Sequence, residues 1–306
     1  MAASGLDPSK IFPFQLDDFQ LEAIDALNQG HSVVVSAPTG SGKTLVGEYA
    51  IYRAIAHGQK VFYTTPLKAL SNQKLRDFRE QFGADNVGLM TGDLSVNREA
   101  SIVVMTTEIF RNMLYAEADE SDDPLADVEA VVLDECHYMN DSQRGTVWEE
   151  SIIHCPLPVQ LVALSATVAN AGQLTDWIER VHGPTHLVHS DFRPVPLQFS
   201  FCSAKGLHPL LNDQGTGLHP NCKVWRAPKG HHRRGKNPKP PQPEPPSMGF
   251  MVAQLVERQL VPAIVFLFSR RGSAKAVRDP PPPRPVASSA SIFSIMGNRT
   301  RTESVF

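Results

Sequence analysis

Eight consecutive residues near the N-terminus combine glycines, a lysine and a threonine in an order that suits a phosphate-binding turn. The segment reads Ala37, Pro38, Thr39, Gly40, Ser41, Gly42, Lys43 and Thr44, between an apolar run and a helical pattern. Glycines let backbone N–H groups approach phosphate oxygens, lysine brings positive charge to the β and γ phosphates, and the threonine hydroxyl can ligate Mg²⁺. A plain glycine-rich turn is the alternative, but Gly-Lys-Thr between a strand and a helix favours a nucleotide loop.

Two carboxylates in Asp134-Glu135-Cys136-His137 come directly after the apolar run Val131 to Leu133. Acids at the end of a buried strand lie at the edge of a sheet, where they can meet a phosphate loop. Transfer of a phosphoryl group to water needs one carboxylate on Mg²⁺ and a second group that orients the water. We assign these roles to Asp134 and Glu135, with Lys43 as the third catalytic residue. Alone, such acids are typical of solvent loops; with the upstream loop, they predict a site for ATP and Mg²⁺.

The fold class predicted by the pattern is α/β, a parallel sheet with helices on both faces. Short apolar runs alternate with helical spacing from Asp17 to about Val188, which is typical of this class. The runs are 32–35, 61–63, 102–105, 131–133 and 161–164. Two helical faces are also readable: one contains Leu67, Leu70, Leu75, Phe78 and Phe82, and the other contains Leu174, Trp177, Ile178 and Val181.

Hydroxyl-bearing residues follow several of these strands. Thr65, Thr106 and Ser165 each come after a predicted parallel strand, as Asp134 does. Ligands of open α/β sheets bind at those carboxyl ends. Threonine hydroxyls and backbone N–H groups suit contacts to phosphates and sugars, which carry little base information. Taken singly, each segment could equally be an ordinary turn or the end of a strand.

The charge, cysteine spacing and apolar content of the chain restrict the partners and the cellular compartment that we expect. The chain has 306 residues, 42% of them hydrophobic, with a net charge of -3, so any nucleic-acid contact needs a local basic surface. Its four scattered cysteines indicate neither a disulfide framework nor a zinc site. Without a signal peptide or a long apolar stretch, we expect a soluble intracellular protein with no membrane contact, in cytoplasm, nucleus or chloroplast.

The C-terminal third departs from the α/β pattern. Residues 206–247 contain a block of lysines and arginines without acids and end in a proline-rich run, which predicts a basic, unfolded linker. That linker is either an electrostatic RNA-binding arm or a plain solvated loop. A predicted helix (250–258) and strand (263–268) follow, and we expect the proline-rich, low-complexity tail at 279–306 to be disordered.

Together the motifs resemble the DExH-box helicases of superfamily two, most closely the superkiller-like branch of RNA helicases. The resemblance covers Phe14 to about Phe199. It implies a P-loop RecA-like domain at 14–190, after an N-terminal extension (1–13) and before a connector (191–205). It also implies that Gln20 reads adenine and that His137, Ser165 and Thr167 couple hydrolysis to strand separation. The implied nucleic-acid contacts are Thr65, Pro66, Leu67, Lys68, Thr91, Gly92, Thr106 and Thr107.

Residues 248–278 are predicted to start a second RecA-like lobe, because Phe266 to Arg271 resembles its opening motif. The family's later motifs, with the arginines that reach the γ-phosphate, have no counterpart here. We therefore expect an incomplete second lobe and slow hydrolysis, since such arginines contribute about 10³ to 10⁵ in rate. Arg270 and Arg271 follow the strand too closely to replace them, and a surface pair is the simpler interpretation.

The sequence thus predicts an ATP-dependent RNA helicase whose partner is single-stranded or partly duplex RNA. One alternative is a non-catalytic RNA-binding or interaction module that retains the lobe without turnover. Another is a DNA helicase, because only the 2′-hydroxyl distinguishes the two sugars. Small-molecule kinases are disfavoured because they do not explain the segments 65–74 and 165–167.

Overall fold

The computed structural model describes residues 6–115, 124–141, 145–222, 246–267 and, for the backbone, 293–296. It divides into two compact units, residues 1–196 and 197–306. Each unit is described by itself. Among the described residues, no helix combines the length and the apolar character needed to cross a membrane.

The first unit is built on an eight-stranded sheet in the order β4-β3-β5-β2-β6-β7-β1-β8. Every pairing in it is parallel except that of β3 with β4. The strands are β1 (Ser32–Ser36), β2 (Lys60–Thr65), β3 (Val87–Met90), β4 (Ser95–Val96), β5 (Ile102–Thr106), β6 (Val128–Leu133), β7 (Gln160–Ser165) and β8 (Thr185–His189). The predicted α/β class and all five predicted strands are confirmed.

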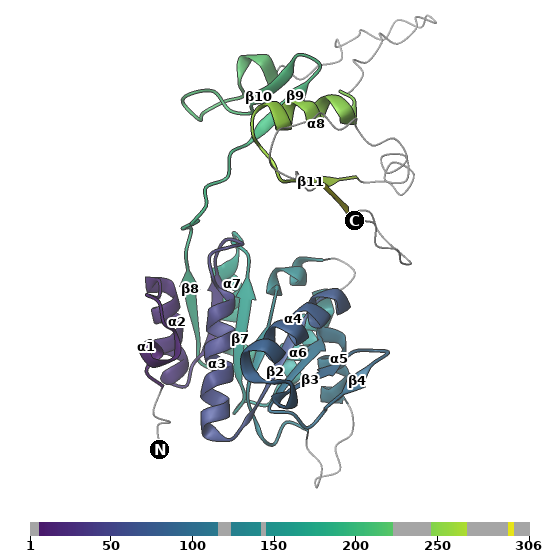
Figure 1. Ribbon diagram of the computed structural model, residues 1–306. Helices are drawn as coiled ribbons and strands as arrows, with labels where there is room; N and C mark the ends of the chain where they lie inside the picture. The colour runs from purple at the N-terminus through teal and green to yellow at the C-terminus, as the bar shows by residue number, and fades with distance from the viewer. Residues whose placement is uncertain (1–5, 116–123, 142–144, 223–245, 268–292, 297–306) are drawn as a thin grey trace, which may run out of the picture. The chain divides into compact units, whose positions relative to one another are not determined.

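Helices cover both faces of this sheet (Figure 1). Residues of α2 (Asp18–Asn28), α3 (Thr44–His57) and α4 (Lys68–Phe82) share one apolar core with alternate strand residues such as Val33 and Val35. Residues of α5 (Thr107–Tyr115), α6 (Gly145–His154) and α7 (Ala171–Val181) share the other core with Val34. Because each central strand is buried on both faces, its sequence is a continuous apolar run rather than an alternating one.

Three strands of this sheet were missing from the prediction. β3 is short and contains Gly88, β4 has two exposed residues, and the edge strand β8 has only two apolar residues among its five. None of the three gives the continuous apolar run that reveals a central strand. The predicted apolar face of α4 also needs correction: Phe78 is fully buried, whereas Leu67 is 40% exposed.

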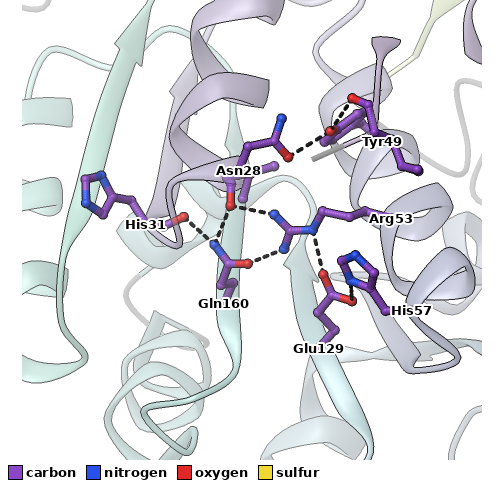
Figure 2. Close-up of polar contacts among 9 residues, drawn as sticks. Asn28, His31, Tyr49, Arg53, His57, Glu129 and Gln160 are labelled. Atoms are coloured by element: carbon purple, nitrogen blue, oxygen red, sulfur yellow. Dashed lines mark hydrogen bonds and ion pairs between the residues drawn. The ribbon is translucent and has the colours of Figure 1, made fainter. Parts of the chain in front are cut away.

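A buried polar network joins the elements where β6 and β7 begin (Figure 2). The guanidinium of Arg53 in α3 donates to Glu129, to the Gln160 side chain and to the backbone carbonyl of Leu27. Glu129 also contacts His57 Nδ1 at 2.9 Å. Arg53 is 3% exposed, so this network fixes α2, α3, β6 and β7 against one another at the edge away from the phosphate loop.

The N-terminal residues contribute to the first unit rather than preceding it. Within the predicted extension, α1 spans Pro8–Ile11 and Phe12 is buried in the core. The Tyr49 hydroxyl donates to the carbonyl of Leu6 at 3.0 Å. The segment is therefore anchored on α3. Its few apolar side chains pack on the first unit, but the segment is too short for a sequence pattern to predict this packing.

The second unit contains a β-hairpin, a helix and a pair of parallel strands. β9 (Ser200–Ser203) pairs with β10 (Gly206–Pro209) antiparallel, and β11 (Ala263–Phe266) pairs with β12 (Phe293–Met296) parallel. Gln254 in α8 (Met248–Glu257) accepts a hydrogen bond from the backbone N–H of Leu207. The predicted helix (250–258) corresponds to α8, and the predicted strand (263–268) corresponds to β11.

Two predictions of irregular structure are wrong in part. Residues 206–222, expected to belong to an unfolded linker, include β10 and a 3-10 helix at 220–222. The tail 279–306 contains β12. In 206–222 the composition misled because backbone pairing needs no apolar run, as β10 shows. In the tail, β12 is a short apolar segment, Phe-Ser-Ile-Met, within a stretch whose overall composition is of low complexity. The basic block within 223–245, Arg270, Arg271 and Pro280 to Pro283 lie outside the described residues.

Candidate nucleotide and nucleic-acid site

The phosphate loop connects β1 to α3, as predicted. Gly40 and Gly42 both have φ of +84°, a left-handed conformation that glycine adopts without a steric penalty. The backbone N–H of Ala37 donates to the carbonyl of Ser165 at 3.2 Å, so the loop starts beside β7. The Ser41 hydroxyl is buried and has no hydrogen-bond partner among the described residues. A buried donor without a partner is costly, and a phosphate oxygen would satisfy it.

Gln20 supports this loop from α2. Its Nε2 donates to the carbonyl of Gly42 at 3.1 Å, and its Oε1 accepts from the backbone N–H of Asp17 at 2.9 Å. The second contact belongs to a capping box at the start of α2, a motif that satisfies N–H groups left free at a helix start. Gln20 is 5% exposed. Its role toward adenine stays a prediction, while its contact with the loop is a feature that the sequence did not indicate.

The two carboxylates after β6 differ in their surroundings. Asp134 is 8% exposed; its Oδ2 accepts from the Tyr63 hydroxyl at 2.8 Å and its Oδ1 from the Glu135 backbone N–H at 2.9 Å. Glu135 adopts a left-handed conformation, with φ of 54°, which is unusual for a residue with a side chain. Its Oε2 lies 3.2 Å from His137 Nδ1. Such outliers are concentrated at functional sites.

A cavity of about 130 Å³ brings the predicted residues together. Lys43 and Thr44 from the loop and Asp134 and Glu135 from the end of β6 line it. Three further lining residues come from α4: Leu70, Gln73 and Lys74. The sequence prediction placed these three within the segment 65–74, which resembles a nucleic-acid-binding motif, and placed Leu70 also on the apolar face of a helix. Gln73 and Lys74 lie three and four residues after Leu70, which puts all three on one helix face. This spacing is the sequence pattern from which their common location could have been predicted.

The described contacts also account for the shifted pKa values around the cavity. Burial, followed by the charge of Asp134, raises the pKa of Tyr63 well above its usual range, so its hydroxyl remains a hydrogen-bond donor. Burial raises the pKa of the Cys136 thiol to about 12. A thiol that stays protonated is a poor nucleophile, so the chemistry of this edge rests on its carboxylates and lysines.

The residues expected to couple hydrolysis to strand separation are partly brought together. The backbone N–H of Ala166 donates to His137 Nδ1 at 3.4 Å, which connects the ends of β6 and β7. Ser165 is fully buried and its hydroxyl donates to the carbonyl of Ala166 at 2.8 Å. Thr167 is exposed. His137 therefore contacts both Glu135 and the segment after β7.

The predicted nucleic-acid residues divide into buried and exposed groups. The hydroxyl of Thr65 lies 2.7 Å from that of Ser71, and the Thr107 hydroxyl donates to the carbonyl of Thr65 at 3.3 Å. Both threonines are fully buried, as Pro66 is also, and Thr106 is 5% exposed. In this conformation the Thr65 hydroxyl is engaged by Ser71 of α4 and the Thr107 hydroxyl by the Thr65 carbonyl, so both groups have internal partners. Their contact with RNA stays a prediction.

The exposed group lies at the ends of β2 and β3. Lys68 Nζ forms an ion pair with Asp93 at 2.7 Å, and the Thr91 hydroxyl donates to the same carboxylate at 3.2 Å. The hydrogen bond from Lys68, then its charge, lowers the pKa of Asp93. Leu67, Lys68 and Gly92 are exposed. Two segments predicted separately are therefore joined into one surface by the ion pair of Lys68 with Asp93.

Comparison with known proteins places this fold and site in a family. The model of the DEAD/DEAH box helicase family matches residues 17–174, more than half of the chain. The chain therefore belongs to the DEAD/DEAH box helicase family, and the predicted resemblance to DExH-box helicases is confirmed.

Among individual relatives, the chain is 56% identical over 211 residues to the chloroplastic DExH-box ATP-dependent RNA helicase DExH15 of Arabidopsis thaliana, covering 68% of this chain and 18% of the relative. It is 43% identical over 272 residues to the human exosome RNA helicase MTR4, covering 86% of this chain and 25% of the relative. The chain thus spans about a quarter or less of these two relatives.

One solved structure shares the fold over most of the chain. The DUF1998 helicase MrfA bound to DNA and AMPPNP aligns with a TM-score of 0.57 at 19% identity, covering 87% of this chain and 35% of that one. At this identity the similarity concerns the fold alone.

Proposed function

We propose that this chain carries the ATP-binding lobe of an ATP-dependent RNA helicase. The observation that supports it most directly is the single cavity lined by Lys43, Thr44, Asp134 and Glu135. Those residues come from two elements nearly a hundred positions apart in the sequence. Phosphate recognition and activation of water need both sets at one place.

The side chains in this cavity fit ATP with Mg²⁺. Lys43 would neutralise the β and γ phosphates. In the adjoining loop the Ser41 hydroxyl, which has no partner in the described part of the chain, would gain an acceptor. Thr44 and Asp134 offer hard oxygen ligands of the kind Mg²⁺ prefers. The bound ion would draw charge from the phosphates, and Glu135 would orient the attacking water. The hydrogen bond from Tyr63 holds the Asp134 carboxylate in a single orientation.

RNA is the polymer that we propose, because relatives of 40% identity or more carry RNA helicase in their names. The exposed surface around Lys68 and Gly92 suits backbone contacts that tolerate any sequence. A DNA helicase remains the competing hypothesis. Competition between RNA and DNA strands of the same sequence decides between them, and preferential displacement by DNA would contradict our choice.

The central test is ATP binding and hydrolysis by the purified chain, with and without single-stranded RNA. Lys43→Ala should abolish nucleotide binding, whereas Glu135→Gln should retain binding and lose hydrolysis. Glu99→Gln is a matched control, since Glu99 is exposed and forms a 3.0 Å ion pair with Lys60 on the surface. ATP binding that survives Lys43→Ala would refute the proposed site. Binding without turnover would instead identify this chain as a nucleotide-binding module.

A further inference from the structure

Lys74 lies on α4 and lines the same cavity as Lys43 and the two carboxylates. Its Nζ lies 5.3 Å from the centroid of the Tyr63 ring and 5.5 Å from that of Phe78. Both rings belong to fully buried residues, so the ammonium rests on a fixed aromatic support. A cation over aromatic faces is held without losing its charge.

The charge of Lys74 has no carboxylate partner within 4 Å in the described part of the chain, where lysine ion pairs involve Lys10, Lys60 and Lys68. An aromatic support attracts an ammonium only weakly at accessible sites. The cavity therefore holds two lysines beside the carboxylates of Asp134 and Glu135. Because the Lys74 ammonium pairs with neither carboxylate, it can form a charge-assisted hydrogen bond to a phosphate oxygen of a bound ligand.

The order of the strands indicates which end of such a ligand Lys74 would meet. Along the sheet the order is β2-β6-β7-β1. The phosphate loop follows β1, the carboxylates follow β6, and α4 follows β2. Lys74 thus comes from the side of the cavity beyond the carboxylates, away from the loop. A nucleotide whose phosphates extend from the loop toward Asp134 and Glu135 would present its terminal phosphate to that side.

We propose that Lys74 binds the γ-phosphate of ATP and thereby distinguishes ATP from ADP; this inference rests on the nucleotide site proposed above. Lys43 binds the β-phosphate, which ATP and ADP share, as well as the γ-phosphate. Lys74 contacts only the γ-phosphate, which hydrolysis removes. Lys74 also lies six residues after Lys68 on one helix, about 9 Å along its axis. One rigid element therefore carries the proposed γ-phosphate contact and the proposed nucleic-acid contact.

The test compares binding of AMPPNP and ADP, each with Mg²⁺, by the complete 306-residue chain and its Lys74→Gln variant, without RNA. Loss of one charge-assisted contact should weaken AMPPNP binding about ten-fold and leave the affinity for ADP unchanged. Lys74→Arg should restore most of the preference, because it keeps the charge. Arg76→Gln, an exposed cation on the same helix, should leave both affinities unchanged.

Two results would overturn the inference while leaving the nucleotide site intact. One is an unchanged AMPPNP affinity in Lys74→Gln. The other is an equal loss for AMPPNP and ADP, which would indicate that Lys74 supports the packing of Tyr63 and Phe78 instead; a thermal melt of the variant would report that loss of packing separately. If the unaltered chain binds neither nucleotide, the proposed function fails together with this inference.

Discussion

The hydroxyl of Tyr63 donates a 2.8 Å hydrogen bond to Oδ2 of Asp134 inside the first unit. Tyr63 lies in β2 and Asp134 follows β6, two neighbouring parallel strands. The bond joins the strand that leads to α4 with the carboxylate proposed for Mg²⁺. It uses one oxygen of Asp134, while the Glu135 backbone N–H contacts the other.

Tyr63→Phe should lower the free energy of unfolding by about 1–3 kcal/mol, because it leaves a buried carboxylate oxygen without its donor. Chemical denaturation at neutral pH measures this loss. Tyr52→Phe provides the control, since the Tyr52 hydroxyl has only an exposed 3.3 Å contact with Gln81. Equal stability of the two variants would show that the buried bond contributes little.

Gln20→Ala should weaken ATP binding and lower stability by about 1 kcal/mol, a typical value for one lost capping contact. The variant loses both the contact to the Gly42 carbonyl and the capping box at the start of α2. Calorimetric titration with AMPPNP and a denaturation curve measure the two effects. Gln29→Ala removes an exposed amide at the other end of α2 and should leave nucleotide affinity unchanged. If Gln20→Ala binds nucleotide normally, the contact with the loop is only structural.

Arg53→Met should destabilise the first unit by about 3–5 kcal/mol, because the Glu129 carboxylate, whose side chain is only 10% exposed, would lose its guanidinium partner. Adding Glu129→Gln to this variant should recover part of the loss, since the uncompensated charge is then gone. Thermal or chemical unfolding of the single and double variants measures the difference. No recovery in the double variant would mean that the hydrogen bonds to Gln160 and Leu27 matter more than the ion pair.

His182 should make the fold sensitive to mild acid. Its imidazole is buried, and Nε2 contacts the carbonyl of Val159 at 2.8 Å. Burial lowers the pKa of His182 below its ordinary value of 6.5, so protons bind more tightly to the unfolded chain. The stability contribution is therefore complete above pH 6.5 and is lost as the pH falls from there through the pKa of the folded state.

Melting temperatures between about pH 8 and about pH 5 test this expectation. His182→Gln, which keeps a hydrogen-bond donor, should lose less stability over that interval than the unaltered chain. Parallel curves for the two proteins would show that His182 does not titrate differently in the folded and unfolded states.

The central strands and the nucleotide motifs could be predicted from sequence because their signals are local. Buried strands such as β1 and β7 are continuous apolar runs, and the phosphate loop requires glycines at 40 and 42, where φ is positive. The edge strands β4 and β8 and the hairpin β9–β10 could not be predicted in this way. Their pairing depends on backbone hydrogen bonds with neighbours, and few of their side chains are buried.

By itself, the sequence determined which chemistry is available: a phosphate loop, two carboxylates and a series of segments at strand ends. Only the tertiary structure decided which side chains share a space. Packing buried the hydroxyls of Thr65 and Thr107, which had been expected to meet nucleic acid. It also brought Tyr63 to Asp134 and Lys74 to the nucleotide cavity. The physical reason is that strand order and helix orientation, which set these contacts, arise from long-range packing and leave no local pattern in the sequence.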